Sequence, residues 1–547
     1  MFKENKDHLQ SQIFSSLSTM DTRLKNRLEK SWAGVFYKHV FSQIDEKLFE
    51  PLYCSDNGRP NFPVNVFVGL EIIKNLRDYT DEVMFEEYAY NYQISYALGL
   101  QTLGQHYFAD RTFYDFRARL YRYTFDQPQK ADVIFEQFEK LTTHFIEIAK
   151  LSTEEQRMDS TLIMANIKRA GRLALAYDVL FKGIHACPAE LLSPSLKEVL
   201  EPDYKNKILY KLKNTDAPSR LGMLLNLCSQ LLELAKDNEK LSTDPEIKLV
   251  ERFLSEQADF DQERKIWLTK NEKDIAANSL QSAHDVDVTF RKKAGKGHVG
   301  FVTNIAETCC DENPVQVVTD FQVEPNITSD IAMAEEALPD LVNKTGLKEL
   351  FTDGGYYGEN LVNQAKELGV EVHFTDMTGK KPSGTRLPFH AFSIQGFKTI
   401  ELCPENHAPS RHGFNPKSGV LNAHFDRATC DQCPHTKVCP VKFQKKDTVL
   451  YVSQKTLIAE DTRQKMQLPD ERKTNTSKRA AIEGTNSALK RSRGAGKLKV
   501  RGLVKCQLVM GLKMIAHNFH QIVRFFQGNT RKSKKLSRIN QGIPATI

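Results

Sequence analysis

Three carboxylates stand where an enzyme could use them together. Asp159 lies in a short apolar, β-branched run, and Asp353 directly follows an apolar segment typical of a buried strand. Glu483 lies on a predicted helix in a strongly basic region. Side chains at the carboxyl ends of neighbouring strands in an α/β sheet converge on one site. Carboxylate oxygens bind hard divalent cations, and two such ions about 4 Å apart stabilise the attacking and leaving oxygens of phosphoryl transfer.

Each acid alone also has a structural explanation. An Asp at a strand end is most often a cap or turn residue, and Glu483 could simply pair with Arg479, four residues before it on a helix. Lys490 lies seven residues beyond Glu483, so all three side chains are predicted on one helical face. The hypothesis of metal-dependent phosphoryl transfer therefore depends on the three acids occurring together, in this order, within one α/β frame.

The positive charge of the chain is concentrated at its C-terminal end. The net charge is +7, but residues 471–547 hold 18 Lys and Arg against two acids, a net of +16 that leaves −9 for residues 1–470. Such asymmetry is typical of a nucleic-acid-binding surface, and contacts to phosphates would make binding salt-dependent. The run 531–538 is predicted to be a solvated basic tail. The candidate DNA contacts are Arg479, Lys490, Arg491, Arg493 and Lys497.

Four of the ten cysteines form a cluster. Cys430 and Cys433 have the C-x-x-C spacing that binds one zinc ion well, and Cys439 with Cys403 could complete four thiolate ligands. Four nearby histidines could replace a thiolate: His407, His412, His424 and His435. The alternative is a small subdomain with reduced cysteines and no metal. The remaining six cysteines are scattered, which favours small core residues over a disulfide scaffold.

The elements that must position these residues form an α/β protein with accessory parts. The sequence predicts a helical N-terminal domain for DNA binding or assembly (1–150), a mixed-sheet catalytic core (151–378) containing a helical insertion (about 170–285), a Cys-rich insertion (379–460), and a C-terminal catalytic helix with a basic region (461–547). Within the core, residues 299–305 and 315–323 are predicted as a hairpin, 347–352 and 370–374 as strands. Residues 503–526 have the period of a long helix with one apolar face.

Composition excludes several classes of protein. With 547 residues, 40% hydrophobic and 27% charged, the chain is globular and large enough for several domains. No apolar run approaches the roughly 18 residues of a membrane span, and the first residues are too charged for a secretory signal. We therefore expect a cytoplasmic protein without a membrane partner.

The acids and their surroundings resemble the DDE transposases of bacterial insertion sequences, which have an RNase H-like catalytic fold. Residues 59–70 and 108–120 look like the N-terminal helical domain of that family. The triplet Asp159-Ser-Thr resembles its first catalytic motif and Asp353-Gly-Gly-Tyr its second. The Arg479, Glu483 and Lys490 spacing matches a third motif of Tyr, two residues, Arg, three residues, Glu, six residues, Lys, except that Thr476 takes the Tyr position.

The resemblance implies a fold, a reaction and partners. Asp159, Asp353 and Glu483 would hold Mg²⁺ or Mn²⁺ for hydrolysis at the element end, after which the freed 3′ hydroxyl attacks target DNA. The expected partners are the terminal inverted repeats, target DNA and further copies of the chain at the bacterial nucleoid. The alternatives are a metal-dependent nuclease that does not join strands, and a domesticated sequence-specific DNA-binding protein with inert carboxylates.

Overall fold

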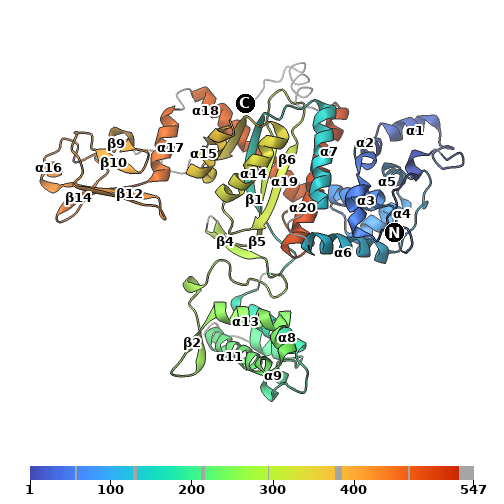
Figure 1. Ribbon diagram of the computed structural model, residues 1–547, viewed down its shortest axis with the longest axis horizontal. Coiled ribbons are helices and arrows are strands. Elements are labelled where there is room, and N and C mark those ends of the chain that lie inside the picture. The colour runs from blue at the N-terminus through green and yellow to red at the C-terminus, as the bar shows by residue number, and fades with distance from the viewer. Residues whose placement is uncertain are drawn as a thin grey trace.

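The fold was taken from a computed structural model of the whole chain, drawn in Figure 1. The structure describes residues 1–10, 12–55, 58–126, 132–168, 170–210, 216–293, 295–375, 385–465 and 469–528. The predicted basic tail at 531–538 lies outside these residues, as do the first residues of the predicted Cys-rich insertion, 379–384. No helix in the described part of the chain is both long and apolar enough to span a membrane.

A mixed sheet of six strands lies at the centre of the molecule. Its order is β4-β5-β1-β7-β8, and β6 pairs with the second half of β5. β1 runs antiparallel to β5 and parallel to β7, and β8 continues the parallel part. This arrangement confirms the predicted α/β class with an RNase H-like mixed sheet. The strands are β1 (Glu155–Ile163), β4 (Thr289–Lys293), β5 (Lys296–Thr308), β6 (Val318–Pro325), β7 (Glu349–Asp353) and β8 (Glu371–Thr375).

Helices cover both faces of this sheet. On one face, α14 (Asp330–Thr345) and α15 (Glu359–Glu367) pack on apolar side chains of β1, β5 and β7. On the other face lie α7 (Val133–Ala149) and α20 (Leu503–Phe526), and α20 has the bounds that its apolar period predicts. Helix–sheet–helix layering buries the sheet from both sides, so its central strands are rigid supports for catalytic groups.

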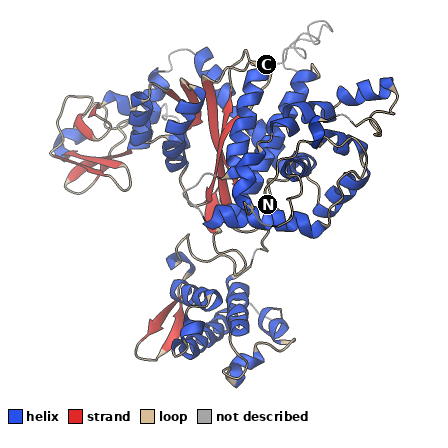
Figure 2. Cartoon of the chain, turned by 45° about the vertical axis from the view of Figure 1, so that its right-hand side comes forward, coloured by secondary structure: helices blue, strands red, loops and turns tan. Residues whose placement is uncertain are grey.

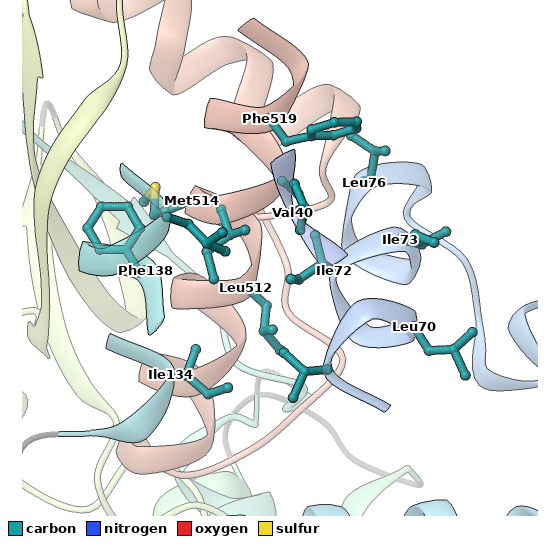
Figure 3. Close-up of a cluster of buried hydrophobic side chains, with 14 of the residues drawn as sticks. Val40, Leu70, Ile72, Ile73, Leu76, Ile134, Phe138, Leu512, Met514 and Phe519 are labelled. Atoms are coloured by element: carbon teal, nitrogen blue, oxygen red, sulfur yellow. The ribbon is translucent and has the colours of Figure 1, made fainter. Parts of the chain in front are cut away.

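The N-terminal helices share a hydrophobic core with the sheet. Figure 3 shows side chains from α3 (Val64–Arg77), α7 and α20 packed in one cluster. The buried amide of Asn518 on α20 bonds to both backbone polar atoms of Val318 on β6, at 2.7 and 2.8 Å, and to Thr142 on α7. The other N-terminal helices are α1 (Thr22–Glu29), α2 (Trp32–His39), α4 (Asp81–Tyr90), α5 (Tyr92–Ala97) and α6 (Asp110–Asp126).

The insertion between β1 and β4 forms a unit with its own hydrophobic core, below the sheet in Figure 1. It contains a hairpin that the helical pattern of the sequence did not predict, and Trp267 fixes this hairpin by donating from Nε1 to Ser229 on α11. Asp285 and Asp287, at the exit of the unit, accept the backbone N–H groups of Gly502, which precedes α20, and of Leu503, its first residue. Its elements are α8 (Arg172–Ala186), α9 (Pro194–Glu198), α10 (Tyr204–Leu209), α11 (Ala217–Lys236), α12 (Glu239–Ser242), α13 (Pro245–Gln257), β2 (Ala258–Asp261) and β3 (Ile266–Thr269).

The Cys-rich segment is a second outlying unit, and Figure 2 shows its strands well away from the central sheet. Four of its strands form a sheet in the order β11-β12-β14-β13. Its elements are β9 (Ser393–Gln395), β10 (Thr399–Leu402), β11 (Arg411–Asn415), β12 (Val420–Asp426), α16 (Arg427–Asp431), β13 (Lys442–Phe443) and β14 (Asp447–Ser453). The chain returns to the core through α17 (Gln454–Lys465), α18 (Pro469–Ala480) and α19 (Ile482–Ser492).

Candidate active site

Asp159 and Asp353 stand side by side on neighbouring parallel strands. The last pair in the β1–β7 ladder is Arg157 with Phe351, and each Asp lies two residues further along its strand. Asp353 ends β7 as the sequence predicts, whereas Asp159 lies in the middle of β1. β1 nevertheless separates from β7 close to Asp159, because beyond Arg157 β1 is paired only with β5. The parting of the two strands therefore leaves two carboxylates facing one space.

Asp159, like Asp353, is half-buried. Burial, and next the charge of Asp353, raise the pKa of Asp159 to about 6, while the charges of Arg479 and Lys293 oppose the increase. Asn486 on α19 donates from Nδ2 to Asp159 Oδ2 at 2.9 Å. This bond fixes one carboxylate oxygen and connects β1 directly to α19.

The turn after Asp353 is shaped by a glycine. Asp353 Oδ1 accepts the backbone N–H of Gly355 at 2.7 Å, and a Cβ at position 355 would lie only 2.8 Å from that oxygen. Tyr356 follows and is completely buried, with its hydroxyl donating to Asn304 Oδ1 of β5 at 2.7 Å. In the Asp353-Gly-Gly-Tyr motif, the backbone at Gly355 therefore lies close enough to orient the Asp353 carboxylate, and Tyr356 attaches the turn to the sheet.

Arg479 is the residue that joins the three acids. Its Nη2 lies 3.7 Å from Asp353 Oδ2, its Nη1 lies 3.0 Å from Glu483 Oε1, and its charge also acts on Asp159. The predicted single helix is divided, since α18 ends at Ala480 and α19 starts at Ile482. Gly484, a weak helix former, lies just after the break. The contact between Arg479 and Glu483 nevertheless persists, and the Glu483 side chain is 68% exposed.

A buried ion pair anchors α19 to the sheet. Arg157 of β1 and Glu307 of β5 lie 2.6 Å apart, and their side chains are 4% and 2% exposed. Thr485 on α19 donates to the second oxygen of Glu307 at 2.7 Å, and Arg157 also donates to the carbonyl oxygen of Lys478 near the end of α18. These bonds hold the helix that carries Glu483 against the two strands behind Asp159.

The predicted DNA contacts occupy different environments. Lys490 is half-buried, and its pKa is lowered by burial and by Lys293, while Asp159 opposes the shift. Arg491 and Lys497 are exposed. Arg493 is buried, and its Nη1 donates to the carbonyl oxygen of Leu76 at the end of α3. Arg479 and Lys490 therefore lie near the acids, whereas Arg493 contacts the N-terminal domain.

Two residues of the site were not among the sequence predictions. Asn486 is three residues after Glu483, so helical spacing alone places it near the same face. Lys293 ends β4, and only the pairing of β4 with β5 brings it toward Asp159. A helical wheel could have found Asn486, but no local signal in the sequence identifies Lys293.

The four clustered cysteines surround one pocket of about 180 Å³. Backbone N–H groups of His407 and His435 donate to Cys403 Sγ and Cys433 Sγ, each at 3.4 Å. Of the four histidines, His407 and His435 also line the pocket, whereas His424 pairs with Asp447 at 2.7 Å on the sheet. All four cysteines are free thiols that line this pocket, but among the described residues no three of them are arranged to hold a metal ion.

The carboxylate oxygens of Asp159, Asp353 and Glu483 are the type of ligand that a hard divalent cation prefers. Repulsion between Asp159 and Asp353 contributes to the raised pKa of Asp159, and a cation between carboxylates removes such repulsion. Among the described residues, however, no group of three or more His, Cys, Asp or Glu side chains is arranged to hold a metal ion. Arg479 stands between Asp353 and Glu483, so Glu483 would have to turn from the guanidinium to join a shared ion.

Two family models match the chain. Residues 24–119 match the transposase domain DUF772, and residues 402–523 match the transposase DDE domain. The first match begins within α1 and ends in the middle of α6, at residue 119. The second includes Arg479, Glu483 and Lys490, while Asp159 and Asp353 lie outside it. No curated protein and no solved structure matches the chain.

These matches to residues 24–119 and 402–523, together with the mixed sheet, support a DDE-type transposase of an insertion sequence. The transposase DDE domain implies DNA as substrate and nuclease or transesterification chemistry in general.

Proposed function

We propose that this protein cleaves DNA at the ends of an insertion sequence and transfers the freed strand into target DNA, using Mg²⁺ or Mn²⁺ held by Asp159, Asp353 and Glu483. The observation that supports this assignment is the position of Arg479, whose guanidinium contacts the carboxylates of Asp353 and Glu483 and acts on Asp159. Arg479 thus connects Glu483 on α19 with Asp353 on β7, beside the space that Asp159 and Asp353 face.

The residues of the chain have distinct tasks in this reaction. Bound divalent cations supply an activated water and stabilise the oxygens of an in-line displacement. Asn486 holds one oxygen of Asp159, and the N–H of Gly355 holds one oxygen of Asp353, so both acids are oriented before any ligand binds. When Glu483 leaves Arg479, that guanidinium becomes available for a bidentate contact with a phosphate. Lys490 adds a second positive charge near Asp159.

Substitution of the acids tests the proposal. Asp353→Asn and Glu483→Gln should abolish cleavage and strand transfer while binding to terminal DNA is retained, because the amide cannot supply an anionic oxygen ligand. Asp340→Asn on α14 is the matched control, since its side chain is 77% exposed and pairs with Lys344 on the same helix. Strand transfer by either acid variant would refute the proposal, and cleavage without joining by the wild-type chain would indicate a nuclease.

The same proposal includes partners and a location. Exposed Arg491 and Lys497 extend the basic surface beyond Lys490, so they are assigned to the DNA backbone, and binding should weaken as salt rises. Joining two element ends requires both ends in one complex, so we assign the active form to a homo-oligomer at the bacterial nucleoid. Sedimentation of the protein with and without paired DNA ends would show whether copies associate.

We also propose that Cys403, Cys430, Cys433 and Cys439 hold a structural zinc ion. The support is the shared pocket and the two N–H···S bonds, because such bonds stabilise thiolate sulfur. A zinc ion would fix the loops of a subdomain whose hydrophobic core is small. Metal analysis of the purified protein should find zinc at one equivalent per chain, and its absence would leave reduced cysteines as the correct alternative.

A further inference from the structure

A pocket of about 250 Å³ lies behind α19, between this helix, the end of the sheet and the last turns of α20. On the α19 side it is lined by the small residues Gly484 and Ala488. Thr485, which binds Glu307, also faces it, whereas Asn486 binds Asp159. The pocket is therefore separate from the space between the acids, although both adjoin the same helix.

Positive and proton-accepting side chains dominate this pocket. Arg493, His517, His520 and Arg524 line it, together with the Arg157–Glu307 pair. Glu307 is the single carboxylate among the described lining residues, and it is already bonded to Arg157 and Thr485. Two guanidinium groups and two imidazoles thus share a cavity in which no carboxylate is left to neutralise them.

The pKa values of the two histidines are lowered in this environment. Burial and the neighbouring cations lower the pKa of His517 to about 3, and the same causes lower the pKa of His520 to about 4. Arg493 and Arg524 contribute to both shifts, and Arg77 contributes to that of His520. An anion in the pocket would relieve this repulsion, because it would lie close to all of these groups.

We propose that the pocket lined by Arg493, His517, His520 and Arg524 binds a phosphate group. Guanidinium groups bind phosphate oxygens through two parallel N–H···O bonds, and imidazole N–H groups add further donors. Ser492 supplies a neutral donor, whereas the Gln521 amide already contacts His517 Nε2 at 3.3 Å and accepts from Arg524 Nη1 at 2.9 Å. The volume is ample for a tetrahedral anion, since a site for one water needs only roughly 10–15 Å³.

Two sources can supply such a phosphate. One is the DNA backbone, which rests on the proposed function and would place a strand behind α19 as well as at the acids. The other is a free phosphate ion, which needs no DNA. In both cases the ligand would bridge α19 and α20, so its binding would tighten the attachment of the helix that carries Glu483.

Calorimetric titration of the full chain with inorganic phosphate in EDTA tests the site itself. EDTA removes divalent cations, so phosphate cannot bind through a metal at the acids, and the outcome does not depend on cleavage activity. The wild-type chain should show saturable binding. Arg524→Gln should weaken it about tenfold to a hundredfold, the usual worth of a charge-assisted hydrogen bond. His520→Gln should weaken it roughly twofold to tenfold.

The control is Lys505→Gln, which removes a charge from the first turn of the same helix, outside the pocket, and should leave the affinity unchanged. The proposal is overturned if the wild-type chain shows no saturable binding, or if Arg524→Gln and His520→Gln both bind phosphate as tightly as the control. Repeating the titration with a short DNA duplex present identifies the source. Loss of phosphate binding supports the DNA backbone as ligand, and unchanged binding supports the free ion.

Discussion

The Arg157–Glu307 pair permits a quantitative test of how α19 is held. Glu307→Gln removes the negative charge but keeps the size of the side chain, which leaves the Arg157 guanidinium buried without a counter-charge. Breaking a buried ion pair on one side costs about 3–5 kcal/mol. We expect the lower end of this range, since the amide oxygen of Gln can still accept from the guanidinium and the carbonyl of Lys478 still accepts from Nη1.

Hydrogen exchange followed by mass spectrometry is the appropriate assay, because a chain with several cores need not unfold in one step. Amides of 478–492 should lose protection by about 3 kcal/mol in Glu307→Gln, while amides of the insertion core should be unaffected. Thr485→Val is the matched control, since it removes only one hydrogen bond to the same carboxylate and should cost about 1 kcal/mol.

A double variant separates the charge effect from the loss of packing. Arg157→Met with Glu307→Leu removes both charges and replaces them by apolar groups, so it should be less destabilised than Glu307→Gln alone. If Glu307→Gln costs no more than Thr485→Val, or if the double variant is the least stable of the set, the pair does not anchor α19 as argued.

Four further predictions concern single residues. Asn486→Ala should lower the rate of DNA cleavage by about tenfold to a hundredfold, because the bond to Asp159 is lost, while DNA binding should stay intact. An unchanged rate would show that the bond has no positioning role. Gly355→Ala should also reduce cleavage in a gel assay, because the added methyl group would press on Asp353 Oδ1, and full activity would mean that the turn adapts freely. Cys433→Ser should lower the zinc content measured by atomic emission and destabilise the Cys-rich unit, whereas an unaltered zinc content would place the metal elsewhere. Burial lowers the pKa of Lys513 to about 8, so the unfolded chain holds this proton up to higher pH, and the free energy of unfolding should rise with pH between about 8 and 10.5. Lys513→Met should remove that rise in urea titrations and be more stable at pH 7 by about 1–3 kcal/mol, and a variant that keeps the full pH dependence would contradict the assignment.

Much of the framework was predictable because it depends on local periodicity. The apolar stripe of α20 predicted its bounds, and short runs typical of strands before and after Asp353 predicted β7 and β8. Asp353 could be placed at a strand end because the apolar run stops directly before it. These patterns depend only on residues close in sequence, so they can be recognised without knowledge of the tertiary fold.

Other features depend on contacts between distant segments, and the sequence could not supply them. Lys293 reaches the site only because β4 pairs with the first part of β5. Arg493 looks like a surface cation in a basic run, yet tertiary packing buries it against Leu76. The β2–β3 hairpin was missed because Trp267 and its neighbours form a run too short to distinguish from helix without the packing surface of α11.

The position of α20 at the end of the described chain has a consequence for synthesis on the ribosome. Glu483 follows Asp353 by 130 residues, and α20 comes later still. At about 5–20 residues per second, roughly 6 to 26 seconds pass between the second acid and the third. During that interval the sheet face that α20 covers is exposed apolar surface, and the N-terminal helices lack the partner that joins them to the core. A nascent chain therefore has neither its complete acid set nor its stable fold, and it acquires both from the same late segment.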